Sequence, residues 1–368
     1  MRIGIPREIK NHEYRVSCTP AGVHELTSRG HEVFIESGAG AGSAFGDSAY
    51  TCAGAQVVES ADEVWAAADL VLKVKEPVAQ EYSRMRQGQL LFTYLHLAAS
   101  RECTDAMLAS GITSIAYETV TARDGSLPLL APMSEVAGRL APQAGAYHLM
   151  RQSGGRGVLM GGVPGTRPAK VVVIGAGVAG RNAIAVADGM RAEVTVFDVN
   201  LAALRVIDDL YRGRVRTVVS NTLELETRIR EADLVIGAVL VPGARAPRLI
   251  SNDLVAQMKP GSVLVDIAID QGGCFADSNP TTHADPTYRV HESVFYCVAN
   301  MPGAVPHTAT IALTNATLPY VVSLAEQGWS EAVVNDPGLA NGLSTHRGLL
   351  LSESIAEAHG YTAKSLVG

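Results

Sequence analysis

The amino-acid sequence predicts an α/β protein with two doubly wound parallel-sheet domains, one inserted into the other. Two observations predict this class. Short β-branched runs alternate with amphipathic stretches, which is typical of parallel strands joined by helices. A long helical segment interrupts this alternation near residue 130, and the alternation then resumes. The chain has 368 residues, 47% of them hydrophobic and 18% charged, so it can bury the cores of about two domains.

Residues 1–130 are expected to form the first part of a discontinuous domain. Continuous apolar runs in this part are typical of strands that helices cover on both faces. The expected strands are residues 31–36, 70–75, 90–95 and 113–118, and the expected helices are residues 20–29, 61–68 and 100–110.

Residues 131–305 are expected to form the inserted domain. It begins with a helical segment at residues 134–151, where Ser134 is the expected N-cap and Pro142 is expected to kink the helix or shift its ends. A further helix at residues 308–327 is expected to return the chain to the first domain, so that residues 306–368 complete it and end in a tail. The expected strands of the inserted domain are residues 170–174, 193–198, 215–219, 233–239 and 262–269.

A dinucleotide fingerprint opens the second series of strands. An apolar strand leads into Gly175, Gly177 and Gly180 in the spacing G-x-G-x-x-G, and a second strand ends in Asp198. These glycines allow a tight turn, a close approach of the backbone to a pyrophosphate, and close packing of helix on strand. The helix N-terminus offers unpaired N–H groups to the phosphates. The pattern predicts a Rossmann-like domain that binds a dinucleotide, with another nucleotide-bearing ligand as the alternative.

Asp198 favours NAD over NADP, because a carboxylate accepts hydrogen bonds from ribose hydroxyls and repels a 2′-phosphate. Arg205 lies near Asp198 in the sequence and leaves NADP open as an alternative.

Four charged or titratable residues fall where open α/β sheets bind ligands, beyond the carboxyl ends of strands. Lys75, His96 and Asp270 each end a predicted strand, and Arg15 lies in an N-terminal loop. Each also has an ordinary interpretation. Lys75 could be a solvated loop residue, His96 a structural side chain, Asp270 a turn residue, and Arg15 the partner of Glu13 on the surface.

Composition and charge exclude several classes. The net charge is -7, and no basic run provides a nucleic-acid or membrane surface. The N-terminus lacks the apolar stretch of a signal peptide, and the longest apolar run, residues 234–241, is too short to span a membrane. The five cysteines include no C-x-x-C pair, which favours buried thiols in a reducing cytoplasm over disulfides or a metal site.

The whole sequence resembles the family of alanine dehydrogenases and of the NAD-binding subunits of proton-translocating transhydrogenases. The resemblance extends from end to end and is far more specific than the glycine fingerprint. The blocks that carry it are MRIGIPREIKNHEYRVSCTPAGVHEL, VLKVKEP, LFTYLHLA, APMSEVAGRLAPQ, IGAGVAG, VIGAVLVPGARAP, LVDIAIDQGGC, YCVANMPGAVPHTAT and LTNATLPYV.

The resemblance implies a reversible, NAD-dependent oxidative deamination of L-alanine to pyruvate and ammonia in a cytoplasmic homohexamer. It implies that Arg15 and Lys75 bind the substrate, that His96 and Asp270 provide acid/base chemistry, and that the discontinuous domain binds the substrate. With the fingerprint glycines, the implied cofactor contacts are Ser134, Gly175, Gly177, Val178, Ala179, Gly180, Asp198, Ser220, Val239, Leu240, Ile267, Ala268, Ile269, Asp270, Val298, Ala299, Asn300 and Met301.

The sequence departs from relatives at three positions. Ala203 and Asn279 stand where basic side chains can hold the cofactor, so those contacts are not carried over. Gln327 stands where a histidine in some members joins Glu118 in binding a divalent ion, so no metal site is expected. Three other functions remain open: a transhydrogenase-type NAD-binding subunit without amino-acid turnover, a dehydrogenase for another small amino acid, and an NAD-binding regulatory protein.

Overall fold

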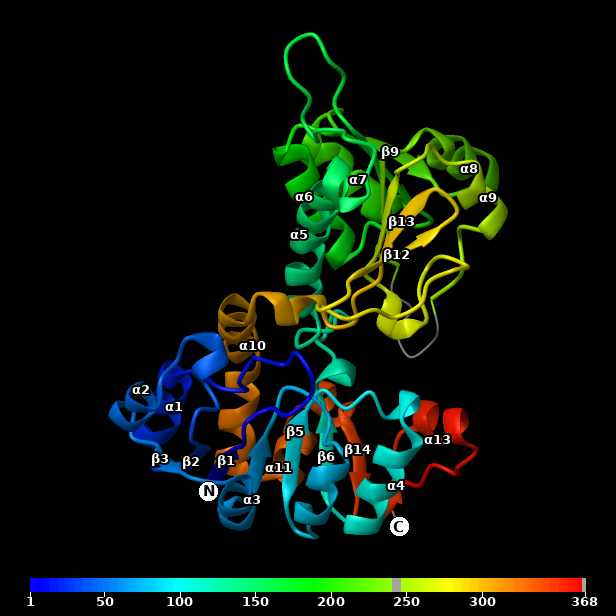
Figure 1. The fold of residues 1–368 in the computed structure, drawn as a ribbon. Coiled ribbons are helices and arrows are strands. Elements are labelled where there is room, and N and C mark those ends of the chain that lie inside the picture. Colours follow the sequence, from blue (N-terminus) through cyan, green and yellow to red (C-terminus); the bar gives the residue numbers. More distant parts are fainter. Residues whose placement is uncertain (240–245, 366–368) are drawn as a thin grey trace. The chain divides into compact units, whose positions relative to one another are not determined.

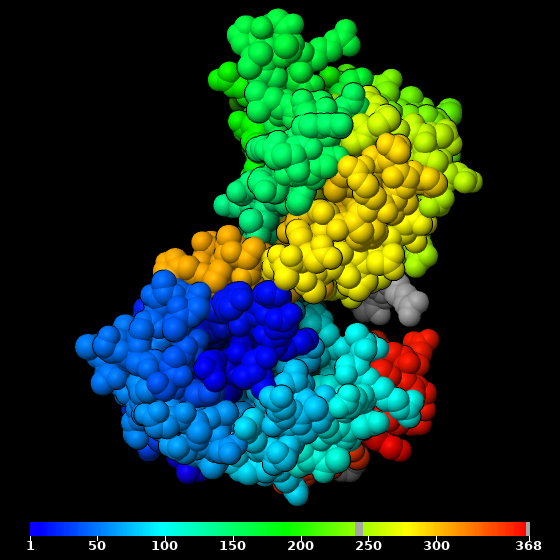
Figure 2. Space-filling model, in the orientation of Figure 1, coloured from blue at the N-terminus to red at the C-terminus, as the bar shows by residue number. Residues whose placement is uncertain are grey.

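The structure, a computed structural model, describes residues 1–239 and 246–365. These residues form two compact units (Figure 1). Unit 1 contains Met1–Met133 and Val305–Gly368, and unit 2 contains Ser134–Ala304. In Figure 2 the blue-to-cyan, orange and red segments belong to unit 1 and the green-to-yellow segments to unit 2. The predicted α/β class with two mainly parallel sheets is confirmed.

The sheet of unit 1 has eight strands among the described residues, in the order β15-β14-β6-β5-β4-β1-β2-β3. The first six strands of the chain run parallel to their neighbours, and β14 and β15 complete one edge in antiparallel pairings. The strands are β1 (Arg2–Ile5), β2 (Glu32–Glu36), β3 (Gln56–Val58), β4 (Leu70–Leu72), β5 (Leu90–Thr93), β6 (Thr113–Ala116), β14 (Leu343–His346) and β15 (Leu349–Leu350).

Several helices of unit 1 begin at side-chain caps that the sequence provides. Thr19 caps the helix that begins at Pro20. Ser60 caps the helix that begins at Ala61, and Ser100 caps the helix that begins at Arg101. Each cap oxygen accepts a backbone N–H that the helix itself leaves unpaired. The helices are α1 (Pro20–Ser28), α2 (Asp47–Cys52), α3 (Ala61–Ala67), α4 (Arg101–Ser110), α10 (Pro306–Gln327), α11 (Trp329–Asn335), α12 (Pro337–Ala340) and α13 (Glu353–His359).

The sheet of unit 2 has seven strands among the described residues, in the order β12-β13-β11-β10-β7-β8-β9. Its strands are parallel except for β12, which pairs antiparallel to β13. Helix α5 (Ala131–His148) leads into the unit, followed by α6 (Val178–Gly189), α7 (Leu201–Tyr211), α8 (Thr222–Glu231) and α9 (Asn252–Ala256). The strands are β7 (Lys170–Ile174), β8 (Glu193–Asp198), β9 (Arg216–Val219), β10 (Leu234–Gly237), β11 (Val263–Asp266), β12 (Thr287–Val290) and β13 (Ser293–Tyr296).

Both sheets are buried on two faces, which explains their uninterrupted apolar strands. In β4, Leu70 and Leu72 join one core cluster while Val71 joins the cluster on the other face. Strand β7 divides its side chains in the same way between two clusters of unit 2. Since successive side chains point to opposite faces, strands covered in this way, such as β4 and β7, have consecutive apolar residues. No helix among the described residues combines the length and apolar character that crossing a membrane requires.

Several predicted boundaries are wrong. Helix α5 starts at Ala131, so Ser134 lies inside its first turn and is not the N-cap. Pro132 explains the earlier start, because proline is favourable in a first helical turn. Pro142 lies within the uninterrupted helix. Strands β4 and β11 end three residues before the predicted limits, and β5 ends two residues before its predicted limit.

The expected C-terminal tail is also wrong. Strand β14 pairs with β6 and with β15, and α13 follows. The sequence analysis missed β1 as well, although Ile3 and Ile5 are fully buried. These strands are two to four residues long, too short for a periodic signal to stand out.

Gly180 is required by close packing, and its replacement tests the fold. A Cβ on Gly180 would lie 1.8 Å from the carbonyl oxygen of Gly175. We expect Gly180→Ala to destabilise unit 2 by about 1–3 kcal/mol, since backbone cannot yield as a flexible side chain does. Thermal unfolding followed by circular dichroism measures the effect, expected as a shift of roughly 2–4 °C per kcal/mol.

Gly189→Ala is the matched control at the other end of α6. A Cβ there meets nothing within 4 Å, so the midpoint should stay level or rise. Equal midpoints for the two variants would contradict the packing argument.

Candidate active site

The carboxyl edge of the unit 1 sheet brings together the predicted substrate residues. Strands β6, β5, β4 and β1 are neighbours in that order, and the loops after the last three carry His96, Lys75 and Arg15. Lys75 and His96 each lie three residues beyond their strand, in loops and not at strand ends as predicted. This is the edge, at the reversal of strand order between β1 and β4, where doubly wound folds bind ligands.

Arg15 is held by a buried carboxylate. Its Nε lies 2.7 Å and its Nη2 2.5 Å from the oxygens of Glu13, and Nη1 lies 3.0 Å from Met133 Sδ. The two side chains are 2% and 1% exposed, so the expected Arg15–Glu13 pair exists but is buried. Burial alone would raise the pKa of Glu13, yet the charge and hydrogen bonds of Arg15 outweigh it and lower that pKa. The guanidinium is therefore fixed in orientation.

His96 adopts a left-handed backbone conformation that Glu118 stabilises. Its φ is 46°, and its backbone N–H donates to Glu118 Oε1 at 2.6 Å, beside the N–H of Leu95. The imidazole is 38% exposed, with Nδ1 3.9 Å from Glu118 Oε1. Its ring stacks at 5.9 Å on Tyr94, whose hydroxyl donates to the Leu129 carbonyl. The imidazole thus has solvent access on a rigid support.

The fingerprint glycines of unit 2 form an open backbone cradle. A Cβ on Gly175 would lie 2.6 Å from the Ala238 carbonyl oxygen, so that turn cannot carry a side chain. Gly177, the N-cap residue of α6, would carry a Cβ into space with nothing within 4 Å. The N-terminal N–H groups of α6, including those of Val178 and Ala179, begin beside this space. The cradle therefore leaves the backbone of Gly177 open at a helix N-terminus, the kind of position where phosphates bind.

Asp198 ends β8 as predicted and connects two loops. Its carboxylate accepts the backbone N–H of Ala176 at 2.6 Å and that of Asn200 at 2.7 Å. The Ser220 N–H donates to the backbone carbonyl of Asp198 at 3.0 Å. A carboxylate has about four acceptor sites, so these two bonds fix Asp198 and leave acceptor capacity for ribose hydroxyls.

Asp270 does not end a strand, because β11 stops at Asp266. Asp270 lies in a short 3-10 helix, Ile269–Gln271. Asp266, which the sequence analysis overlooked, accepts the N–H groups of Ala268 and Cys274 and the hydroxyl of Ser278. Burial raises the pKa of Asp266, although these donors act in the opposite direction. Its signal in the sequence is an acid directly after three apolar strand residues.

The remaining predicted cofactor residues of unit 2 divide into three groups. Val239 and the segment Val298–Met301 follow β10 and β13 at the same carboxyl edge, and Val298 and Met301 are buried. Ser134 lies within α5. Leu240 is outside the described residues.

Glu118 and Gln327 have separate partners. Glu118 accepts the N–H groups described above, while Gln327 at the end of α10 bonds to Ser323 and Asn335. Over the described residues, no group of three or more His, Cys, Asp or Glu side chains is arranged to hold a metal ion.

Two Rossmann-like units, one of which has a dinucleotide fingerprint, are typical of a class, the dinucleotide-dependent oxidoreductases. Within it, the chain belongs to the alanine dehydrogenase/PNT family: residues 4–137 match the family's N-terminal domain and residues 141–353 its C-terminal domain.

Individual relatives agree with this family. An alanine dehydrogenase of Mycolicibacterium smegmatis is 67% identical over 357 residues, which cover 97% of this chain and 96% of the relative. A solved structure titled L-alanine dehydrogenase has a TM-score of 0.94 at 53% identity, covering 98% of this chain and 99% of the other. A transhydrogenase from Sinorhizobium meliloti has a TM-score of 0.82 at 29% identity, covering 96% and 100%.

Gly177 allows the cradle to be tested without disturbing the fold. We expect Gly177→Ala to keep its thermal midpoint, because the added Cβ meets no protein atom. NADH affinity, measured by fluorescence titration, should fall at least about tenfold, since the methyl occupies the space for the pyrophosphate. Gly189→Ala should bind NADH as the unmodified chain does. Undiminished affinity in Gly177→Ala would place the phosphates elsewhere.

Proposed function

We propose that the chain catalyses the reversible oxidative deamination of L-alanine, in which L-alanine, NAD and water give pyruvate, ammonium, NADH and a proton. One observation of geometry carries the proposal: an arginine, a lysine and a histidine follow three adjacent strands at one edge of the unit 1 sheet. Full-length identity to alanine dehydrogenases specifies the amino acid.

The substrate is held by its charges in this proposal. Arg15, whose Nε and Nη2 hold Glu13, supplies a fixed guanidinium charge of the kind that suits a carboxylate. Lys75 supplies positive charge where the carbonyl or carbinolamine oxygen becomes negative. Arg15 thus binds the carboxylate that pyruvate and alanine share, and Lys75 binds the oxygen at the reacting carbon.

His96 is the proposed general acid and base. Oxidation of alanine gives an imine, and hydrolysis requires a base to take a proton from the attacking water. The same group must return a proton to the departing ammonia. Histidine is suited to both steps near neutral pH, and the exposed imidazole can exchange protons with solvent.

The residues of unit 2 hold the cofactor in this proposal. When bound, NAD accepts the hydride from the substrate Cα. The glycine cradle holds the pyrophosphate, Asp198 accepts the ribose hydroxyls and favours NAD over NADP, and Asp270 orients water or ammonia near the nicotinamide. Backbone groups of Val298–Met301 are further contacts, because two of these side chains are buried. We also propose a cytoplasmic homohexamer, on family resemblance.

The direct experiment mixes purified protein with L-alanine and NAD at mildly alkaline pH and follows NADH absorbance. An increase that needs L-alanine, fails with D-alanine and reverses with pyruvate plus ammonium supports the proposal. NADH binding without turnover would favour the transhydrogenase-type subunit, to which the chain is less similar in sequence.

A histidine variant tests the acid/base step. We expect His96→Asn to lower kcat at least about a hundredfold, the usual contribution of a general acid–base group, while NADH affinity changes little. Asparagine tolerates the left-handed backbone, so the loop should keep its shape. His291→Asn is the matched control, since His291 has a φ of 49° in the turn between β12 and β13. Equal loss of NADH affinity in His96→Asn would assign His96 to the cofactor site.

A further inference from the structure

Unit 1 contains a fully buried ion triad beside the substrate edge. The ammonium of Lys73 lies 3.0 Å from Glu8 Oε2 and 2.9 Å from Glu81 Oε1. The three side chains are at most 2% exposed. Burial would lower the pKa of Lys73, but the two carboxylates outweigh it and raise that pKa. Buried charges of this kind are costly, and the acid/base chemistry described above does not use them.

The triad holds both sides of the loop that carries Lys75. Glu8 Oε1 accepts the backbone N–H of Val74 at 2.5 Å and that of Lys75 at 3.2 Å. On the far side, Glu81 Oε2 accepts the N–H of Val78 at 3.0 Å. Lys73 therefore joins two carboxylates that hold the same loop before and after Glu76 and Pro77.

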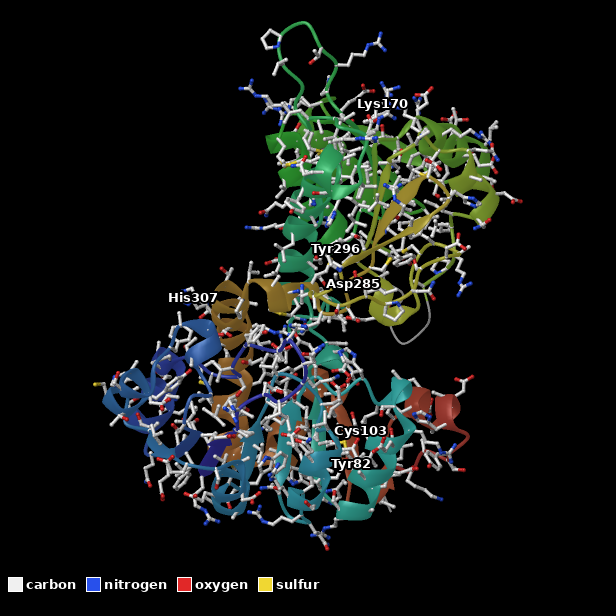
Figure 3. The ribbon with its side chains drawn as sticks, in the orientation of Figure 1. Tyr82, Cys103, Lys170, Asp285, Tyr296 and His307 are labelled. Carbon is white, nitrogen blue, oxygen red and sulfur yellow. The ribbon has the colours of Figure 1, made fainter. Side chains whose placement is uncertain are left out.

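Further side-chain contacts hold the backbone of this loop in one conformation. The Thr93 hydroxyl donates to the Lys75 carbonyl at 3.0 Å. Cys103 Sγ on α4 lies 3.6 Å from the Pro77 carbonyl oxygen and beside Tyr82 (Figure 3). Beyond β4 the loop has few ladder bonds of its own, so these side-chain contacts determine its path.

We propose that Glu8, Lys73 and Glu81 are positioning residues that act through Lys75: they hold its backbone so that its ammonium meets the substrate oxygen. The inference rests on the proposed role of Lys75 in binding substrate. A buried carboxylate that accepts two N–H groups fixes an orientation that a solvated loop would lose to competing water.

The main test is Glu8→Gln, which keeps the volume and removes the charge. The amide oxygen can accept from the loop or from Lys73, but not from both in the wild-type arrangement. We expect the Kd for pyruvate, measured in the presence of NADH, to rise about tenfold. A change of this size corresponds to the loss of one hydrogen bond to a charged group. NADH affinity alone should stay unchanged. Glu81→Gln, which alters the carboxylate that accepts the Val78 N–H, should also raise the Kd for pyruvate.

Asp47→Asn is the matched control in unit 1. The Asp47 carboxylate also accepts a backbone N–H, that of Gly38 at 2.9 Å, but it holds a different loop. Pyruvate binding to this variant should equal that of the unmodified chain. A tenfold loss here would mean that any such carboxylate matters equally, and would overturn the proposal.

A double-mutant cycle separates positioning from general stability. If Glu8 acts through Lys75, Glu8→Gln should have almost no further effect on pyruvate binding in a Lys75→Gln background. A full additional loss in that background would show that Glu8 acts independently of Lys75 and would overturn the proposal.

A second readout needs no substrate and distinguishes this inference from the proposed function. Acetylation of the Lys75 amine by a succinimidyl ester can be followed by peptide mass spectrometry, with Lys170 in unit 2 as internal reference (Figure 3). We expect the rate at Lys75 to change at least about threefold in Glu8→Gln and not in Asp47→Asn. An unchanged rate overturns the positioning role. A changed rate with no pyruvate binding by the unmodified chain would keep the role and overturn the proposed function.

Discussion

The loops at the carboxyl edges of both sheets depend on one requirement. Where the parallel strands end, the following backbone N–H groups no longer have acceptors in a neighbouring strand and need other acceptors. In both units these groups are met by a carboxylate that accepts two backbone N–H groups beyond a strand end. Glu8 and Glu118 do this in unit 1, and Asp198 and Asp266 do it in unit 2. Because an unpaired buried N–H is costly, each carboxylate fixes the path of its loop.

The same arrangement controls charge at the unit 1 edge. Arg15 is neutralised by Glu13, and Lys73 by Glu8 and Glu81. The buried cations are thus held by buried anions, and their geometry is set before any ligand arrives. In the proposed function, a carboxylate substrate would meet these preorganised donors, which lowers the cost of ordering on binding.

The sequence was sufficient where a local rule decides the structure. The sequence predicts the positions of Gly175 in a tight turn, Gly180 at a close helix–strand contact and Asp198 at a strand end. Each residue lies at its predicted position. The sequence was insufficient where a distant partner decides. Glu8 looks like an ordinary surface acid within a charged N-terminal segment, and only the fold brings it to the backbone 66 residues away. Strand β4 also depends on this distant partner: the N–H of Lys73 still donates to Phe92 in β5, but the N–H groups of Val74 and Lys75 donate to Glu8.

The antiparallel edge of the unit 1 sheet has a consequence for synthesis on the ribosome. Strand β6 is complete once residue 116 is made, but its partner β14 comes only at Leu343–His346, after all of unit 2. Helix α10, whose Leu313 and Leu324 belong to the core of unit 1, also comes late. Until then, β6 is an open edge of the kind that pairs with other chains. Unit 2 is continuous in sequence and can form its core first. The sheet of unit 1 therefore keeps β6 as an unpaired edge during the time in which unit 2 is synthesised and folds.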